Sequence, residues 1–169
     1  AGVREICDQT GALLVFDCVQ TGIGRTGQWF GYEYSGVRPD AITLAKGLGA
    51  GLPLGALITL GIASSLFVPG EHGTTFGANP VICAASLAAL SVLMKNALKQ
   101  EKLIRKGLES FDLVSEVRGQ GLLLGIGLTK PIANDFAMWL AQLGVLVNAP
   151  NPTTIRLAPP LNISDAQVK

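Results

Sequence analysis

Unbroken apolar runs of strand length recur in the first half of the chain. They are residues 12–16 (ALLVF), 41–45 (AITLA) and 54–59 (LGALIT). Because apolar and polar residues do not alternate in these runs, we predict strands of a sheet that is covered on both faces. The first run leads into Asp17 and the second into Lys46, so each charged residue is predicted at the carboxyl end of a strand. Residues 3–10 precede them as the end of a helix that Gly11 stops.

A long helix is predicted from Asn79 and Pro80, because asparagine caps free backbone N–H groups and proline suits the first helical turn. Its sequence is nearly all apolar as far as Met94, so we expect it to be buried on most sides. From Lys95 to Ser110 the pattern becomes amphipathic and rich in lysine. Further elements are predicted as strands at residues 121–128, 144–148 and 154–157, a helix near 132–143, and a helix capped by Ser164 that the chain does not finish.

The amphipathic segment marks a change in organisation, and we place a domain boundary there. Residues 1–100 are predicted to belong to an α/β domain with a mostly parallel sheet, and residues 101–169 to a small α+β domain. A sheet with so few strands would leave long apolar edges unpaired. We therefore expect the chain to be truncated at both ends.

Composition narrows the classes of function. Hydrophobic residues make up 49% of the chain, which is enough for a packed core, and 13 basic against 12 acidic residues leave a formal charge of +1. We expect no nucleic-acid partner, because no excess of positive charge is present to neutralise a phosphate backbone. His72 is the only histidine, and Cys7, Cys18 and Cys83 form no CxxC pair, so we expect free thiols and no metal site.

Residues 47–70 carry no charge and are long enough to cross a bilayer. Their six glycines and two prolines would leave backbone groups unsatisfied in lipid, so we expect no membrane span. The first eleven residues lack the apolar core of a signal peptide. These features predict a cytoplasmic protein.

A GxGxxG motif at Gly22, Gly24 and Gly27 follows the first predicted strand, and Asp40 lies eighteen residues after its first glycine. The motif resembles a dinucleotide-binding fingerprint, which requires a helix that opens at the third glycine. Residues 28–40 show no helical pattern and contain two glycines and a proline, and the motif also lacks the lysine of a P-loop. A glycine-rich connection over the edge of the sheet is the alternative that fits these residues better.

Lys46 stands between an apolar strand and a glycine-rich turn. Desolvation in such a setting lowers the pKa of a lysine from about 10.4 and makes its amine a nucleophile for a carbonyl group. Asp17 ends the preceding strand, so both side chains are expected in the crevice at the carboxyl edge of the sheet, where open α/β sheets bind ligands. An ordinary solvated lysine, or a plain ion pair between Asp17 and Lys46, are the alternatives.

Ordered blocks of sequence make the chain resemble the class III aminotransferases, with the acetylornithine aminotransferases as the nearest members. The blocks are LLVFDCVQTGIGRTG (13–27), PDAITLAKGLGAGLPLGA (39–56), HGTTFGANP (72–80) and IRLAPPL (155–161). The similarity covers essentially the whole chain. It implies the C-terminal part of the large domain of the fold type I pyridoxal-phosphate-dependent transferases, followed by an incomplete small domain.

The resemblance implies pyridoxal 5′-phosphate (PLP) as cofactor, bound to Lys46 as an internal Schiff base. Asp17 would keep the pyridine nitrogen protonated, so that the ring can accept the electron pair released when the substrate's C–H bond breaks. Val19 would pack on one face of the ring, and Gln20 would hydrogen-bond near its phenolic oxygen. Cys18, in the same cofactor-binding segment, replaces the family's usual second acidic residue and costs the site a negative charge.

The resemblance also implies substrates and a partner. Thr75 would bind the phosphate of the cofactor in the neighbouring subunit of a homodimer, and Thr74 would contact substrate. Arg156 would grip the substrate's α-carboxylate with its planar, bidentate fork. Ala78 stands where the family commonly has glycine.

The implied reaction moves an amino group from an amino acid, N2-acetyl-L-ornithine, to a 2-oxo acid, 2-oxoglutarate, in arginine biosynthesis. Ornithine, succinylornithine and 4-aminobutyrate aminotransferases share these blocks and stay open as alternatives, as does a non-catalytic remnant. The family's amino-terminal portion, with its glycine-rich phosphate loop, is not in the chain. We therefore expect the chain alone to be a poor enzyme.

Overall fold

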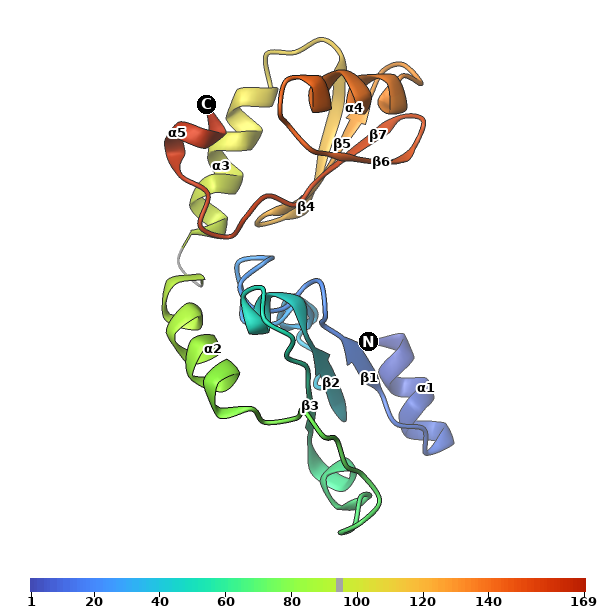
Figure 1. Ribbon diagram of the computed structural model, residues 1–169. Coiled ribbons are helices and arrows are strands. Elements are labelled where there is room, and N and C mark those ends of the chain that lie inside the picture. The colour runs from blue at the N-terminus through green and yellow to red at the C-terminus, as the bar shows by residue number, and fades with distance from the viewer. Residues whose placement is uncertain (94–95) are drawn as a thin grey trace. The chain divides into compact units, whose positions relative to one another are not determined.

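The computed structural model describes residues 1–93 and 96–169, which divide into two compact units (Figure 1). The first unit comprises residues 1–23 and 28–93, and the second comprises residues 24–27 and 94–169. Met94 and Lys95, where the sequence pattern changes from apolar to amphipathic, lie outside the described residues. Each unit has its own sheet and its own hydrophobic core.

The first unit is built on a three-stranded sheet of order β1-β2-β3, in which β1 runs parallel and β3 antiparallel to β2. Its elements are α1 (Gly2–Thr10), β1 (Val15–Asp17), the 3-10 helix η1 (Gly31–Ser35), β2 (Ala41–Leu44), η2 (Lys46–Gly49), β3 (Ala56–Thr59), η3 (Gly61–Ser65) and α2 (Pro80–Leu93). The predicted strands are confirmed, although β1 begins three residues later than its apolar run. Asp40 explains this shift, because its carboxylate accepts the Leu14 N–H while the Leu14 carbonyl accepts the Asp40 N–H.

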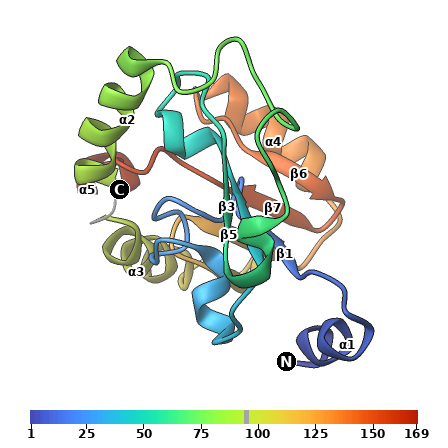
Figure 2. The same ribbon diagram turned by 90° about the horizontal axis from the view of Figure 1, so that it is seen from below.

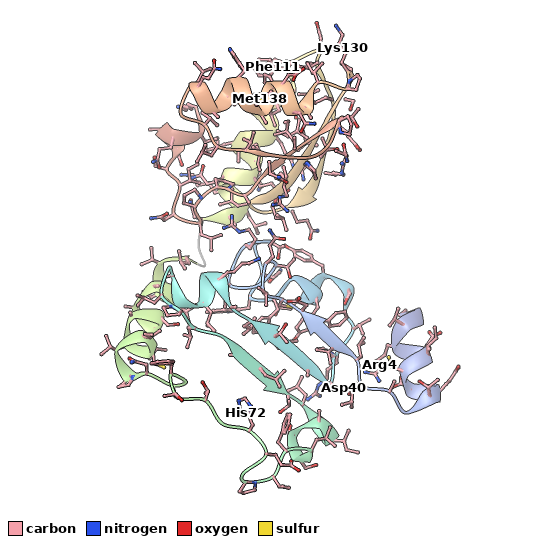
Figure 3. The ribbon with its side chains drawn as sticks, turned by 45° about the vertical axis from the view of Figure 1, so that its right-hand side comes forward. Arg4, Asp40, His72, Phe111, Lys130 and Met138 are labelled. Carbon is pink, nitrogen blue, oxygen red and sulfur yellow. The ribbon has the colours of Figure 1, made fainter. Side chains whose placement is uncertain are left out.

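The same carboxylate fastens α1 to the sheet. Arg4 of α1 donates to Oδ2 of Asp40 at 2.7 Å and also pairs with Asp8, and Figure 3 shows the Arg4 and Asp40 side chains close to one another. The hydrogen bonds from Arg4 and from the Leu14 N–H hold the pKa of Asp40 below its usual value. Asp40 is therefore a structural ion-pair partner here.

Acid is expected to destabilise the first unit through this carboxylate. Because the pKa of Asp40 is lower in the folded chain than in the unfolded one, its stabilisation is complete above about pH 4 and is lost as the pH falls through the folded value. Urea unfolding followed between pH 6 and pH 2 measures this loss. Asp40→Asn should flatten part of that pH dependence, and an unchanged profile in the variant would contradict the assignment.

The core of the first unit gathers around Cys18, Ile23, Ile42 and Leu44. Tyr32 stacks between Phe16 and Phe30 and closes one side of this cluster.

Helix α2 begins at Pro80 as predicted, and the Asn79 side chain caps it by accepting the backbone N–H of Val81. The expected burial of this helix is wrong, since Ser86 is its only buried residue while Leu87 remains 71% exposed. Helix α2 packs against η2 through one face only, where the Ser86 hydroxyl donates to the Leu48 carbonyl. An all-apolar helix shows no preferred face in sequence, so its pattern could not say how many neighbours it has.

The second unit contains a four-stranded antiparallel sheet of order β4-β5-β7-β6. Its elements are α3 (Ala97–Leu108), β4 (Val114–Gln120), β5 (Leu123–Leu128), α4 (Ala133–Gln142), β6 (Asn148–Asn151), β7 (Thr154–Leu157) and α5 (Asp165–Val168). Figure 2 shows α4 beside β6, and Ile126, Ile155 and Ala133 form the core between this helix and the sheet. The domain boundary predicted after residue 100 falls inside α3.

Residues 24–27 pack within the second unit. The Leu122 N–H donates to the Arg25 carbonyl, and the Arg25 guanidinium donates back to the carbonyls of Leu122 at 3.0 Å and Pro159 at 2.6 Å. The glycine-rich segment forms turns and bends, and no helix opens at Gly27. The dinucleotide alternative therefore lacks the helix that it requires.

Residues 47–70 are not a membrane-spanning helix, because they hold η2, β3 and η3. Within residues 1–93 and 96–169, no single helix is long and apolar enough to cross a bilayer. Helices α2 and α3 reach that length and composition only when counted together, across the two undescribed residues.

Candidate active site

Asp17 and Lys46 lie at the same edge of the first sheet. The parallel register of β1 and β2 pairs Asp17 with Thr43, and the Cys18 N–H continues the ladder to the Thr43 carbonyl at 3.0 Å. Lys46 follows β2 after one intervening residue and begins η2. Because both strands run in the same direction, their carboxyl ends deliver the carboxylate and the amine to one place.

The Asp17 carboxylate is held as an anion. Its Oδ1 accepts the Val19 N–H at 2.9 Å and the Thr43 hydroxyl at 3.0 Å. These two hydrogen bonds, followed by the nearby positive charge of Lys46, hold the pKa of Asp17 below its usual value. Oδ1 takes both bonds, so Oδ2 is open to a further donor.

Thr43 was not singled out from the sequence. It is the one polar residue in the AITLA strand, and its neighbours Ile42 and Leu44 are buried on the other face. This position could have indicated that Thr43 faces the same side as Asp17, because alternate residues of a strand point to opposite faces.

Lys46 has a left-handed backbone, with φ of 47°. Such a conformation is uncommon for a residue with a side chain, costs on the order of 1 kcal/mol or more, and often marks a functional position. The side chains of Lys46 and Asp17 are both exposed. The desolvation of Lys46 expected from the sequence is therefore wrong for the chain as the structure describes it.

Ile23 is a second residue that the sequence did not single out. It is 3% exposed, has φ of 56°, and lies where a Cβ on Gly47 would be 3.4 Å away. Its N–H donates to the Trp29 carbonyl at 2.7 Å and closes the glycine-rich loop. Ile23 thus packs against the backbone immediately after Lys46 and helps to fix where that lysine emerges.

The three residues after Asp17, which the resemblance assigns to cofactor binding, differ in burial. Cys18 is 1% exposed and packs with Ile42 and Leu44, so its thiol lies in the hydrophobic core. Val19 is partly exposed and Gln20 is exposed.

The two threonines and the arginine lie elsewhere in the chain. Thr74 and Thr75 are exposed in the loop before α2, which also carries His72 (Figure 3). Ala78, at the end of this loop, has φ of 55°, a conformation that a glycine would adopt without strain. Arg156 lies on β7 of the second unit, where it is exposed.

The residues at the sheet edge fit PLP. An exposed primary amine can attack an aldehyde, and a carboxylate with an open oxygen can accept a hydrogen bond from a protonated ring nitrogen. Among the described residues, no group of three or more histidine, cysteine, aspartate or glutamate side chains is placed to hold a metal ion. The chemistry that this edge supports is therefore that of an amine and a carboxylate acting on an organic carbonyl.

Comparison with curated proteins agrees with this chemistry. Acetylornithine aminotransferase of Streptomyces coelicolor is 53% identical to this chain, and that of Mycobacterium tuberculosis is 51% identical. The matches cover 98% and 99% of this chain but 43% and 44% of those relatives. The chain thus spans less than half the length of the proteins that it matches.

Solved structures show the same architecture. The N-acetylornithine aminotransferase of Stenotrophomonas maltophilia matches with a TM-score of 0.84 at 38% identity over 98% of this chain and 46% of that one. An ornithine aminotransferase of Toxoplasma gondii, described as having partial PLP occupancy at its active site, matches with a TM-score of 0.83 at 32% identity over 98% and 42%. The fold is therefore the predicted C-terminal part of the fold type I large domain with a small α+β domain. The family model described as aminotransferase class-III matches residues 1–169, and the chain belongs to this family of PLP-dependent enzymes.

Proposed function

We propose that this chain supplies the lysine-bearing part of an aminotransferase that moves an amino group between N2-acetyl-L-ornithine and 2-oxoglutarate in arginine biosynthesis. The meeting of Asp17 and Lys46 at one sheet edge, with Asp17 held as an anion, is the observation that carries the proposal. The 53% identity to an acetylornithine aminotransferase supports the choice of substrate. We expect a cytoplasmic enzyme.

Bound PLP would supply an electron sink for the carbanion left when the substrate loses its α-proton. Lys46 would hold the cofactor covalently and, once released by the substrate amine, would carry that proton between carbon atoms. Asp17, oriented by Thr43 and the Val19 N–H, would keep a proton on the ring nitrogen. Arg156 would bind the α-carboxylate of the substrate.

The remaining assignments concern neighbours of the ring and a second subunit. Val19 and Gln20 would contact the ring, Thr74 would contact substrate, and Thr75 would bind the phosphate across the interface of a homodimer. The exposure of both threonines leaves them available to such a partner. Cys18 would support this segment from within the core.

Other class III aminotransferases remain rival assignments, because matched structures include ornithine aminotransferases and S-selective transaminases. A non-catalytic remnant is the rival from another class, and the exposure of Lys46 favours it.

Uptake of PLP tests the proposal directly. The purified chain, alone and with the amino-terminal part of a relative supplied as a separate chain, is mixed with PLP. We expect a visible absorbance band and, after borohydride reduction, a mass increase located on Lys46. Lys46→Ala should abolish both signals, because the amine is absent.

Lys130→Ala is the matched control, since Lys130 is an exposed lysine in the second unit (Figure 3). It should leave both signals unchanged. Failure of the chain to take up PLP under both conditions would refute the enzyme assignment, and equal labelling of Lys46→Ala would refute the assigned residue.

A further inference from the structure

Strand β4 forms one edge of the second sheet, because β5 is its only neighbour in the order β4-β5-β7-β6. The free side of an edge strand is a template on which another strand can pair. The opposite edge, β6, contains Pro150, which has no N–H to donate, and its register is interrupted between Asn148 and Asn151. Pairing at β6 is thus limited by its own backbone, and β4 is the edge that another strand could extend.

An ion pair from helix α3 lies against this edge. Glu101 and Arg105 are one helical turn apart and pair at 2.9 Å. The Arg105 guanidinium donates through Nη1 to the Val117 carbonyl and through Nη2 to the Gly119 carbonyl, the second bond at 2.7 Å. Oε2 of Glu101 accepts the N–H of Gly121, the residue after β4, at 2.6 Å. The pair therefore offers donors and an acceptor to the backbone, as a neighbouring strand would.

The two carbonyl groups that Arg105 binds point away from β5. They belong to residues two positions apart, a spacing at which carbonyl groups point to the same side of a strand. The side chains of Glu101 and Arg105 are only 15% and 31% exposed. The planar guanidinium is held by its partner and its two acceptors, so it occupies the edge as a fixed group.

Beyond Arg105 the edge of β4 is open. A hollow of about 300 Å³ lies between the end of α3 and residues 114–117, and Arg105 forms part of its lining. Ser115, the extra residue where the register with β5 shifts, is exposed there, and Val114 and Val117 are partly exposed. Loss of the Arg105 side chain would extend this open edge from residue 117 to residue 119.

We propose that the Glu101–Arg105 pair caps the edge of β4 and prevents this strand from pairing with β4 of a second copy of the chain. The charges of the strand fit that partner. An antiparallel pairing about a two-fold axis at Val117 would place Glu116 of each copy opposite Arg118 of the other. Opposite charges directly across two strands stabilise their pairing, so β4 is complementary to itself and needs a cap to stay single.

Sedimentation equilibrium of Arg105→Ala over a range of concentrations tests this inference. We expect folded Arg105→Ala to form a species of about twice the wild-type mass, because a two-fold pairing closes after two copies. Hydrogen exchange should locate the new contact, with the amides of residues 115–119 exchanging about tenfold more slowly in the larger species.

Three further variants separate pairing at this edge from other effects. Lys102→Ala is the control, since Lys102 is an exposed lysine of the same helix, and it should keep the wild-type mass. Arg105→Lys keeps the charge but cannot span two carbonyls with one ammonium, so it should associate more weakly than Arg105→Ala. Arg118→Glu added to Arg105→Ala would place glutamates opposite one another and should restore the wild-type mass.

The inference is overturned if folded Arg105→Ala keeps the wild-type mass at every concentration, or if it associates without slower exchange at residues 115–119. Should circular dichroism show that Arg105→Ala does not fold, Arg105→Lys decides, and a wild-type mass for folded Arg105→Lys overturns it. These measurements use no PLP. Failure of the cap is therefore distinguishable from failure of Lys46 to take up the cofactor.

Discussion

Gly121→Ala is expected to lower the free energy of unfolding of the second unit by about 3–5 kcal/mol. Gly121 has φ of 59°, and a Cβ there would lie 2.5 Å from the Arg25 carbonyl oxygen and 2.6 Å from the Thr26 carbonyl carbon. Both atoms are backbone and cannot rotate away. Alanine would therefore strain residue 121 and push residues 24–27 off the Leu122 N–H and carbonyl.

Such a loss is large beside the 5–15 kcal/mol that usually separates folded and unfolded states. Urea unfolding, followed by circular dichroism, measures it. Gly107→Ala is the matched control, because Gly107 lies in α3 and a Cβ there would meet no atom within 4 Å, so alanine should raise stability by about 0.5–1 kcal/mol. A Gly121→Ala variant within about 1 kcal/mol of the wild type would show that the 24–27 segment is not held as described.

Asp17→Asn is expected to lower the turnover of the chain, once completed by the amino-terminal part of a relative, by on the order of a hundredfold. Asparagine has nearly the same shape but carries no charge, so it cannot keep the ring nitrogen of PLP protonated. Covalent uptake of PLP by Lys46 should survive, because the amine is intact. Single-turnover kinetics separates this effect from substrate binding.

Two further variants test the role of Asp17: Thr43→Val should give a partial effect, and Asp112→Asn is the control. Thr43→Val removes one of the two hydrogen bonds that keep the pKa of Asp17 low, so we expect a smaller loss of turnover and a pKa that moves back toward its usual value. Asp112 is exposed in the second unit, and its change to asparagine should have no effect. Turnover unchanged in Asp17→Asn would contradict the role assigned to this carboxylate.

Local sequence patterns were enough for most of the elements. The Asn79–Pro80 pair set the start of α2, the apolar run at residues 41–45 located β2, and the strand predicted at residues 154–157 coincides with β7. These signals act within a few residues, through capping bonds and side-chain alternation, so a sequence displays them directly. β4 was missed, because residues 114–120 (VSEVRGQ) carry polar residues and a glycine and show no apolar run.

The candidate site was predicted in part. Family blocks pointed to Asp17 and Lys46, yet they did not identify Thr43 as the residue that orients the carboxylate or Ile23 as the support beneath Gly47. The contact of Asp17 with Thr43 depends on strand register, and the contact of Ile23 with Gly47 depends on how the glycine-rich loop folds. Each contact joins residues more than twenty positions apart in the sequence.

The sequence by itself determined most of the helices and strands, because capping and periodicity are local properties of the chain. Its family blocks also named Asp17 and Lys46 as the candidate reactive groups. Only the tertiary structure decided that the Asp17 carboxylate accepts the Thr43 hydroxyl, that Lys46 stands exposed, and that Arg105 lies against the free edge of β4. The reason is geometric. Shifting a strand by one residue turns every side chain to the other face while leaving its sequence unchanged, so which groups meet is set by register and packing.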